Sequence, residues 1–463
     1  MTAEERQQRK YEQMVEGPLP GLIISLALPM IASNLVTSIY NMADTYFVGR
    51  LGDISSATSA TGAVGVAYAL QVMVQAIGYS FGNGTSNNVS RLLGAQKREE
   101  AKSYASTGML TAMFIGMIFA AVCVVLRWPL ARFLGATDTI LPYAAEYIMF
   151  LMPAAPFMIG SFCLNTLLRA QGNAMYAMWG LIVGGLINVA LDPLLIFGAG
   201  MGVSGAALAT AVSQMIGFCI LFVINSERLG NLGIGLSHFR PSKERYVNIF
   251  HLGIPSLFRQ GVSSVATIVL NNVAAPFGDA AIAAMMIVNR VTQAVYSIMV
   301  GFGNGFMPVC GYNFGAKRYR RVRSGYLFSL CLTTAWLVGI AAAIFIFAPS
   351  VITLFRGDDP EVIAIGAAAM RMQCCSVPVL GCFLFCNTTS QALGYSGRAT
   401  LLAVSRQGLF FVPVICLMTW LFGLTGIQLA QPVSDVCSLM ISIPLTLKLL
   451  RSLNIPDGAE YTG

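Results

Sequence analysis

The chain has 463 residues with a formal net charge of +8, and 56% of its residues are hydrophobic while only 10% are charged. Because a soluble globular protein usually has about 25% charged residues, this composition excludes that class. Apolar runs of about 20 residues recur along the chain, long enough to cross the hydrocarbon core of a bilayer. These runs lack the alternation of barrel strands, so an all-α polytopic membrane protein is predicted.

The positive charge follows membrane topology rather than a nucleic-acid-binding surface. With both termini in the cytoplasm, most of the 28 Lys and Arg residues fall in inner loops and tails, including the clusters "AQKREEAK" and "AKRYRRVR". Cytoplasmic loops of membrane proteins show this excess. We therefore expect a multi-pass protein of the cell membrane with both termini cytoplasmic and with no nucleic-acid partner.

Twelve membrane-spanning helices are predicted, six in each half of the chain. In chain order they cover residues 19–46, 57–83, 103–126, 140–168, 174–198, 203–225, 245–275, 280–310, 322–348, 362–392, 398–422 and 425–450. The expected organisation is a cytoplasmic N-terminal tail (1–17), an N-terminal lobe (18–228), a cytoplasmic linker (229–244), a C-terminal lobe (245–450) and a cytoplasmic C-terminal tail (451–463).

The two halves repeat one another. "FGNGTSNNVSRLLGAQKR" at 81–98 matches "FGNGFMPVCGYNFGAKRY" 221 residues later, and "GVSGAALATAVS" at 202–213 matches "GLTGIQLAQPVS" at the same offset. Pro29 also matches Pro255. Because six helices restore the same orientation, the lobes are expected to be related by a pseudo-two-fold axis along the membrane normal. Transporters place a substrate site between such lobes, so the repeat favours a transporter. The alternative function for a duplicated helix bundle is a channel or a scaffold.

The first span contains a carboxylate, Asp44, and Tyr40 lies four residues earlier on the same helix face. An Asp at the centre of a membrane helix costs roughly 2.5–3.5 kcal/mol, so one that persists usually lines a cavity or pairs. The alternative is that Asp44 lies near the outer interface and extends into it.

The fifth span, "GGLINVALDPLLIFG", places Asn188 and Asp192 on one face. Pro193 follows directly and frees backbone carbonyls from the helix. Two acids, an amide and such carbonyls provide ligands for a proton or a hard cation such as Na⁺. An interfacial position is the alternative for Asp192 too. The repeat-equivalent positions carry no acid, which favours an ion-coupling site in the N-terminal lobe.

The second half has its own intramembrane charges, whose roles the sequence leaves open: Arg259, Arg290, Arg406 and Asp435. We expect Asp435 to neutralise Arg406 or Arg290 in a structural pair. The chain has neither a nucleotide-binding G-x-x-x-x-G-K-[ST] motif nor a catalytic constellation, so an ATP-driven pump and an enzyme are not expected, and no cofactor is expected.

Five motifs carry a resemblance to a known family: "LALPM", "YNMADTYFVGRLG", "RAQGN", "NVALDPLLIFG" and "GAALAT". With them the whole chain resembles the multidrug and toxic compound extrusion family, in its bacterial DinF-like or MepA-like branch. The resemblance implies two six-helix lobes around a central cavity. It also implies a drug/cation antiporter.

The resemblance further implies residue roles. The implied ion-coupling network is Asp44, Asp192, Asn188, Thr210, Tyr40 and Asn165, and the implied bending residue of the first helix is Pro29. With Na⁺ as the coupling ion, the metal ligands would be Asp44, Asp192, Asn188 and Thr210. A substrate cavity is expected to include Asn34, Asn41 and Gln260. A Na⁺-coupled branch of the family uses a glutamate in the seventh helix and an aspartate in the tenth helix. This chain has neither acid at those places.

The sequence therefore predicts a secondary active multidrug efflux antiporter that exports organic cations and other xenobiotics by alternating access. The coupling ion is H⁺ or Na⁺, the partners are small cationic or amphipathic drugs and the lipid bilayer, and the functional unit is a monomer. The alternative is a lipid-linked oligosaccharide flippase of the same superfamily, for which Arg259, Arg290 and Arg406 would line a cationic cavity. The drugs, the coupling ion and the physiological role stay open.

Overall fold

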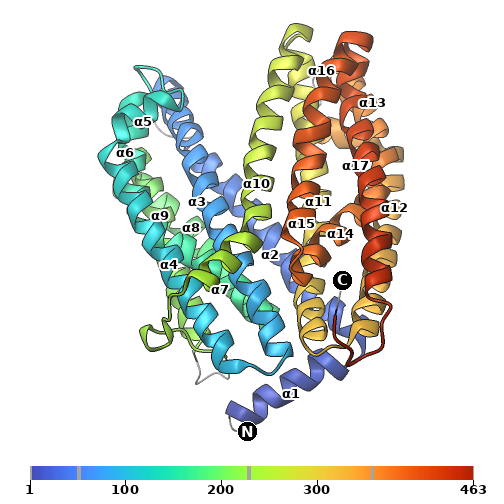
Figure 1. Ribbon diagram of the computed structural model, residues 1–463. Helices are drawn as coiled ribbons and strands as arrows, with labels where there is room; N and C mark the ends of the chain where they lie inside the picture. The colour runs from blue at the N-terminus through green and yellow to red at the C-terminus, as the bar shows by residue number, and fades with distance from the viewer. Residues whose placement is uncertain (1–2, 49–53, 227–230, 356–358, 462–463) are drawn as a thin grey trace. The chain divides into compact units, whose positions relative to one another are not determined.

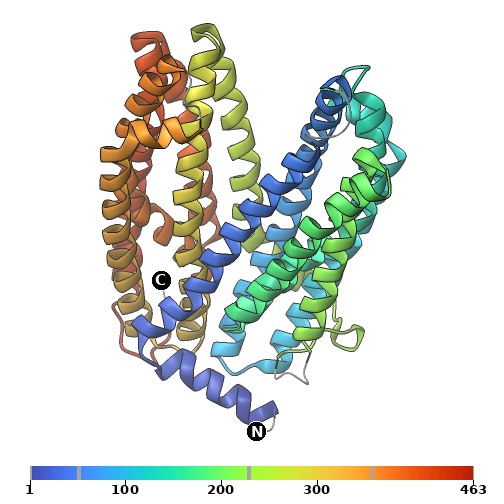
Figure 2. The same ribbon diagram turned by 180° about the vertical axis from the view of Figure 1, so that it is seen from behind.

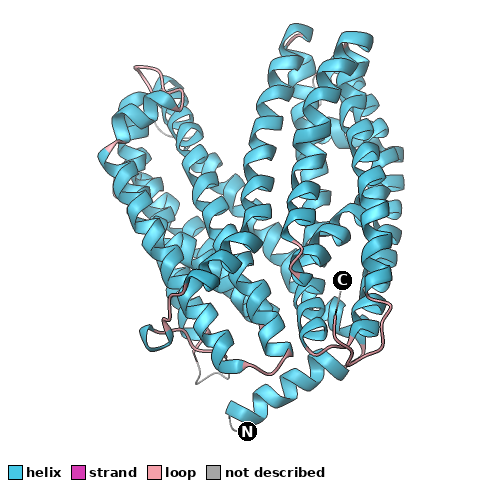
Figure 3. Cartoon of the chain, viewed as in Figure 1, coloured by secondary structure: helices cyan, strands magenta, loops and turns pink. Residues whose placement is uncertain are grey.

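The computed structural model describes residues 3–48, 54–226, 231–355 and 359–461, and side chains at 38–48 and 54–61 are among those it does not describe. In the described part every regular element is a helix (Figure 3). The helices form two compact units. Unit 1 contains residues 1–16 and 32–253, and unit 2 contains residues 17–31 and 254–463.

Unit 1 is built from the helices of the first half of the chain (Figure 1). They are α1 (Ala3–Glu16), the second part of α2 (Leu19–Val48), α3 (Ile54–Gly94), α4 (Arg98–Val125), α5 (Arg127–Phe133), α6 (Leu141–Leu151), η1 (Met152–Ala154), α7 (Ala155–Ala170), α8 (Ala174–Pro193), η2 (Leu194–Gly198), α9 (Gly202–Ile224), η4 (Leu236–His238) and the start of α10 (Lys243–Ala274).

Unit 2 contains the first part of α2 and the rest of α10. Its other elements are η5 (Ala275–Phe277), α11 (Asp279–Gly315), α12 (Tyr319–Phe355), α13 (Pro360–Ser376), η6 (Val377–Val379), α14 (Leu380–Leu393), α15 (Ser396–Val404), η7 (Ser405–Phe410), α16 (Phe411–Phe422) and α17 (Leu424–Ser452).

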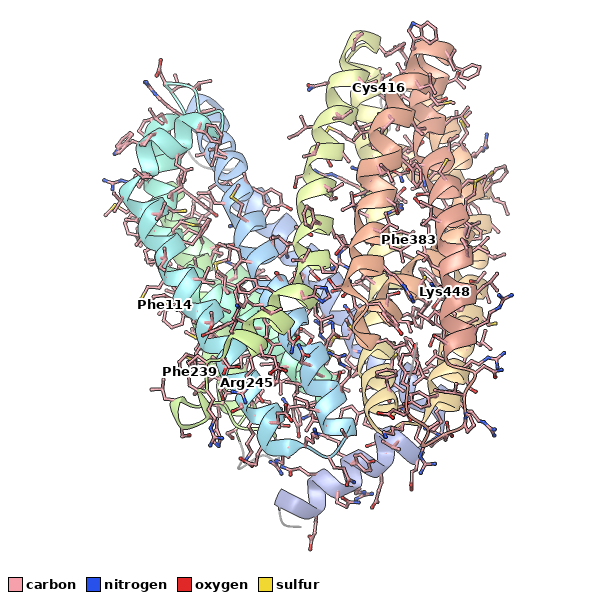
Figure 4. The ribbon with its side chains drawn as sticks, viewed as in Figure 1. Phe114, Phe239, Arg245, Phe383, Cys416 and Lys448 are labelled. Carbon is pink, nitrogen blue, oxygen red and sulfur yellow. The ribbon has the colours of Figure 1, made fainter. Side chains whose placement is uncertain are left out.

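Eleven helical segments of the described residues are long and apolar enough to cross a membrane. The predicted seventh span, within α10, is not among them, because Arg259, Gln260 and several serines lower its hydropathy. At about 1.5 Å per residue, the 32 residues of α10 are nevertheless long enough to cross. Outward-facing apolar side chains such as Phe114 on α4 suit contact with lipid (Figure 4). The prediction of an all-α polytopic membrane fold is confirmed, and the chain is a multi-pass membrane protein.

The two units interrupt corresponding spans in the same way. The fourth span consists of α6 and α7 joined by the 3₁₀ turn η1, which contains Pro153. The tenth consists of α13 and α14 joined by the 3₁₀ turn η6, which contains Pro378. Because proline has no N–H and its ring crowds the preceding turn, it breaks the α-helical ladder at both points.

Backbone conformations also repeat between the units. Gln96 and Lys317, which lie 221 residues apart, are the two non-glycine residues with positive φ in the described part, at 60° and 56°. Gly202 and Gly423, at the same separation, both have φ of 57°. Such left-handed positions are costly for residues other than glycine, so a shared one indicates a shared loop geometry. This agreement supports the internal repeat predicted from the sequence.

Two helices contribute to both units. Helix α2 belongs to unit 2 up to Ile31 and to unit 1 from Ala32, and it is one continuous helix in Figure 2. Helix α10 belongs to unit 1 up to Gly253 and to unit 2 from Ile254. Pro29 and Pro255 lie within two residues of these boundaries. Each half therefore starts its first helix in the unit formed mainly by the other half.

Glycines hold these exchanged segments in place. A Cβ on Gly305 of α11 would lie 2.6 Å from the Ala27 nitrogen of α2, within unit 2. A Cβ on Gly84 of α3 would lie 2.1 Å from the Ile249 oxygen of α10, within unit 1. Gly84 and Gly305 are 221 residues apart and belong to the repeated "FGNG" motif. The motif is thus explained by a close backbone approach in both units.

Candidate functional site

Three of the polar residues singled out in the first half meet inside unit 1. Asn188 Nδ2 on α8 donates to Asp192 Oδ1 at 3.4 Å, one turn along the same helix. The same nitrogen lies 3.3 Å from Thr210 Oγ1 on α9. All three side chains are buried, and Asp192 has no exposed surface. The structure therefore assembles one carboxylate, one amide and one hydroxyl where α8 faces α9.

Glycines bring α8 and α9 close enough for this contact. A Cβ on Gly180 would lie 2.3 Å from Leu221 Cδ2, and one on Gly217 would lie 3.4 Å from the Gly180 oxygen. A Cβ on Gly184, one turn before Asn188, would lie 3.5 Å from the Ser213 oxygen. Small residues allow membrane helices to approach closely without unsatisfied polar groups. These glycines allow α8 and α9 to pack closely, so that Thr210 lies opposite Asn188.

The backbone changes directly after Asp192. Pro193 has no N–H to complete the helical hydrogen bond to Val189, and η2 then continues as a π-helical turn. Gly205 on α9 packs against η2, because its Cβ would lie 2.8 Å from the Leu195 carbonyl. Single π-helical turns occur frequently at functional sites. The carboxylate therefore lies where the regular ladder of α8 ends.

The other predicted site residues have different positions. Asn165 on α7 donates to the Ala177 carbonyl oxygen at 2.9 Å, and the described contacts do not bring it to Asp192. Its repeat partner, Asn387, donates to the Ala399 oxygen at 2.7 Å, so this bond fastens corresponding helices in both units.

Helix α2 carries the remaining predictions for the first half of the chain. Pro29 is buried inside it and Asn34 is half-buried, whereas the side chains of Tyr40, Asn41 and Asp44 lie outside the described residues. Gln260 is half-buried on the part of α10 that belongs to unit 2.

The cluster around Asp192 offers oxygen atoms for a proton or a small hard cation. It has the carboxylate of Asp192, the hydroxyl of Thr210 and the amide of Asn188, which are ligand types for hard cations. No group of three or more His, Cys, Asp and Glu side chains that could hold a metal occurs among the described residues. The oxygen donors among the described residues suit a proton or a small hard cation.

Unit 2 contains a second buried polar cluster. Asp435 on α17 accepts from Arg406 Nε and from Gln431 Nε2 at 2.8 Å each. Its other oxygen accepts from Ser376 Oγ at 2.9 Å and from Gln373 Nε2 at 3.2 Å. The expectation that Asp435 pairs with Arg406 or Arg290 is confirmed for Arg406. Arg290 is exposed and Arg259 is half-buried.

The sequence did not identify the neutral members of this second cluster. Gln373 and Ser376 are three residues apart and Gln431 and Asp435 four apart, which places each pair on one helix face. That spacing is a usable signal, but amides and hydroxyls are frequent inside membrane helices. The contact between α13 and α17 that joins the pairs is set by packing, which the spacing does not report.

Comparison with known families decides the classification. The sequence model of the family MatE matches residues 29–194 and 255–417, well over half of the chain and once in each half. This chain belongs to the MatE family. The resemblance to the multidrug and toxic compound extrusion family drawn from the motifs is thereby confirmed. The match includes Asn188, Asp192 and Arg406, whereas Thr210 and Asp435 lie outside the matched segments.

Full-length relatives agree with the MatE classification. The chain is 27% identical over 445 residues to the protein named multidrug export protein MepA of Staphylococcus haemolyticus strain JCSC1435, covering 94% of this chain and 95% of the relative. It is 28% identical over 457 residues to the MepA protein of Staphylococcus aureus strain NCTC 8325 / PS 47, covering 96% and 97%.

Solved structures share the fold of this MatE chain. A MATE crystal structure in a bent conformation has a TM-score of 0.89 at 24% identity, covering 96% of this chain and 98% of that one. Another, in a straight conformation, has a TM-score of 0.88 at 24% identity, covering 95% and 98%. At this identity the likeness establishes the fold.

Proposed function

We propose that this MatE protein is a secondary active multidrug exporter that moves organic cations and other amphipathic compounds out of the cell in exchange for H⁺ or Na⁺. Relatives named as multidrug export proteins align with it over nearly their whole length. The observation that carries the ion coupling is Asp192, a carboxylate without exposed surface that has an amide and a hydroxyl beside it. Such intramembrane acids mark ion pathways.

The proposed coupling step occurs between α8 and α9. An ion or proton at Asp192 changes the charge that Asn188 and Thr210 face, so their hydrogen bonds rearrange. We propose that Asp44 and Tyr40 complete this site from α2, and that α2 bends near Pro29 as the site fills. The ion shifts the conformational equilibrium only by the difference between its affinities for the two states.

Both termini are proposed to lie in the cytoplasm of a cell-membrane monomer, and the drug pathway is proposed to include Asn34, Asn41 and Gln260. The flippase alternative requires several cationic side chains around one cavity. Within the described residues Arg290 is exposed and Arg406 is paired with Asp435, so no observation favours that function.

The test is dye export from inverted membrane vesicles with an imposed pH or Na⁺ gradient. We expect one of the gradients to drive accumulation of a cationic dye in wild type and Asp192→Asn to abolish it. Asp138→Asn is the matched control, because Asp138 is an exposed acid paired with Arg132 and its loss leaves the buried cluster intact. Normal gradient-driven export by a folded Asp192→Asn protein would refute coupling at this site.

A further inference from the structure

The motif "RAQGN" at residues 169–173 lies outside the Asp192 cluster, yet its polar side chains are buried in unit 1. It forms the turn between α7 and α8. Gln171 Oε1 accepts from the Leu232 nitrogen at 2.8 Å, and the Asn173 side chain donates to the amide oxygen of Asn231. The motif therefore holds the segment that joins the two halves of the chain.

The use of Asn173 indicates that this contact has a purpose of its own. Asn173 directly precedes α8, where asparagine is favoured because its side chain can accept from the unpaired N–H groups of the first turn. Within the described residues it makes no such capping bond and binds Asn231 instead. Asn231 Nδ2 also donates to the oxygen of Ile224, the last residue of α9, at 2.6 Å. Asn231 thus bridges the start of α8 and the end of α9.

Gln171 makes a second bridge between the same two helices. Its Nε2 donates to Asn225 Oδ1, directly after α9, and to the Leu167 oxygen of α7, at 3.0 Å each. The Gly233 nitrogen donates to the Asn225 oxygen at 3.1 Å. Helices α8 and α9 carry all three side chains of the Asp192 cluster. The two helices of that cluster are therefore joined a second time, at their other ends, through residues that follow α9.

The docked linker, residues 231–242, then follows α4 towards α10. Four side chains of α4 bond to its backbone at distances of 3.1–3.4 Å, namely Arg98, Ser103, Ser106 and Thr107. Loops are usually more mobile than the helices they connect, but here hydrogen bonds from buried hydroxyls fix the linker backbone at several points. The docked linker is therefore an attached part of unit 1.

The first part of α10 continues this attachment. Asn248 Nδ2 donates to the Tyr104 hydroxyl of α4 at 3.1 Å. Arg245, labelled in Figure 4, has its guanidinium carbon 5.6 Å from the centroid of the Tyr104 ring, a cation–π contact. Residues 231–253 thus belong to unit 1 by contacts along their length, and α10 enters unit 2 at Ile254.

We propose that the docked linker transmits a shift of α8 against α9 to the crossing of α10, with Gln171 and Asn173 as positioning residues. The inference rests on the proposed ion coupling at Asp192. A helix carries a displacement along its axis, here about 28 Å from Asp192 to Asn173. Helix shifts of about 1–2 Å are typical of conformational switches. Because both helices are bonded to the docked linker, the linker follows their shift and displaces the start of α10.

Hydrogen–deuterium exchange on purified protein tests this link without transport. Asp192→Asn removes the charge of the cluster and is expected to change amide exchange in the docked linker by about fivefold or more. In the background Gln171→Met/Asn173→Ala, which lacks both bridges, adding Asp192→Asn is expected to cause no further change. Asp138→Asn, at an exposed acid of unit 1, is the control and is expected to change nothing. Unchanged exchange in Asp192→Asn would overturn the proposal and leave a passive tether.

Export kinetics separate positioning from folding. Gln171→Met keeps the side-chain length but removes its hydrogen bonds. It is expected to lower the maximal rate of dye export by about fivefold or more, while the ion concentration for half-maximal export stays within about twofold of wild type. Gln96→Met makes the same change at an exposed position in the α3–α4 turn and is expected to alter neither quantity. A normal maximal rate with a lowered unfolding midpoint in Gln171→Met would overturn the proposal.

A double-mutant cycle tests the bridge itself. Asn173→Ala and Asn231→Ala break the same hydrogen bond, so the double variant is expected to export at the rate of Asn231→Ala alone. Additive losses would show that the two residues act separately and would exclude the bridge.

The exchange and export results keep the two proposals distinguishable. If wild type shows the exchange response to Asp192→Asn but exports no dye under either gradient, the export function fails and the link from Asp192 to α10 stands. If wild type exports dye and the exchange response is absent, the export function stands and the link fails.

Discussion

At the residue scale, two buried acids of this protein have different surroundings. Asp192 lies in a cluster with an amide and a hydroxyl joined by contacts of 3.3–3.4 Å, whereas Asp435 accepts four closer bonds, one of them from an arginine. A carboxylate with a fixed cationic partner gains less from a proton or a cation than one beside neutral amide and hydroxyl groups. This contrast supports the proposed ion coupling at Asp192 in unit 1.

Thr210→Val tests the neutral part of the Asp192 cluster. The substitution keeps the shape but removes the hydroxyl that Asn188 contacts, which costs about 1 kcal/mol. We expect the H⁺ or Na⁺ concentration for half-maximal export to rise by about fivefold. Thr210→Ser retains a hydroxyl and is expected to behave like wild type. An unchanged ion dependence in Thr210→Val would remove Thr210 from the coupling site.

The end of unit 2 at which the C-terminal tail docks gives a pH-dependent prediction. Tyr395 donates to Tyr461 of the C-terminal tail at 2.6 Å, and burial, followed by this hydrogen bond, raises the pKa of Tyr395 above its usual value. When the tail detaches, the tyrosine ionises near its usual pKa of about 10. The docked state therefore holds its proton longer, so docking is unaffected below about pH 10 and weakens as the pH rises further.

Limited proteolysis of a C-terminally tagged protein measures this docking. The tail is expected to be protected up to about pH 10 and cleaved faster above it, after correction with an unstructured peptide carrying the same tag. Constant protection up to about pH 11.5 would show that the Tyr395–Tyr461 contact does not hold the tail.

At the element scale, helix contacts depend on glycines whose importance hydropathy does not show. Gly84 and Gly65 both lie on α3, but a Cβ on Gly84 would meet the Ile249 oxygen at 2.1 Å, whereas one on Gly65 would meet nothing within 4 Å. We expect Gly84→Ala to destabilise the protein by about 1–3 kcal/mol through overpacking. Gly65→Ala is expected to be neutral or stabilising by up to about 1 kcal/mol.

Thermal unfolding in detergent compares the two variants on the same helix. A midpoint for Gly84→Ala at or above that of Gly65→Ala would contradict the close packing of α10 on α3. The corresponding contact in unit 2 is that of Gly305 with Ala27. Gly305→Ala is therefore also expected to have a lower unfolding midpoint than Gly65→Ala.

The helices themselves were predictable from the sequence because apolar length and loop charge determine spans. Their interruptions were less predictable: the sequence predicted loosened carbonyls near Asp192, and η2 begins two residues later, but η7 at Arg406 was not foreseen. A π-helical turn requires an inserted residue that changes the spacing locally, and hydropathy averages over it. The pairing of Asp435 was predicted from charge, whereas Gln373 and Ser376 joined it through packing of α13 on α17.

At the scale of the whole molecule, α2 and α10 are the two helices that pass from one unit to the other. Their boundaries lie within two residues of Pro29 and Pro255, which the repeat had already paired. Proline inside a helix weakens the ladder at one turn and allows bending there. The repeat in the sequence pairs the two prolines, but it does not predict that each half contributes a helix segment to the other unit.

Pro255→Ala tests whether the second crossing bends as the first is proposed to do. We expect both Pro29→Ala and Pro255→Ala to slow export several-fold while the unfolding midpoint stays level or rises, because a stiffer helix opposes the conformational change. Pro349→Ala is the control, since Pro349 lies inside α12 and within unit 2. Export rates of Pro255→Ala equal to those of Pro349→Ala would exclude a hinge at Pro255.

The central claim is that export and ion movement are coupled through Asp192. In proteoliposomes without an imposed ion gradient, an outwardly directed gradient of a cationic dye is expected to drive H⁺ or Na⁺ inward through wild type, because coupling between two ligands is reciprocal. Asp192→Asn is expected to show no dye-driven ion movement. Ion movement at the wild-type rate through Asp192→Asn, or its absence in an active wild-type preparation, would contradict the account.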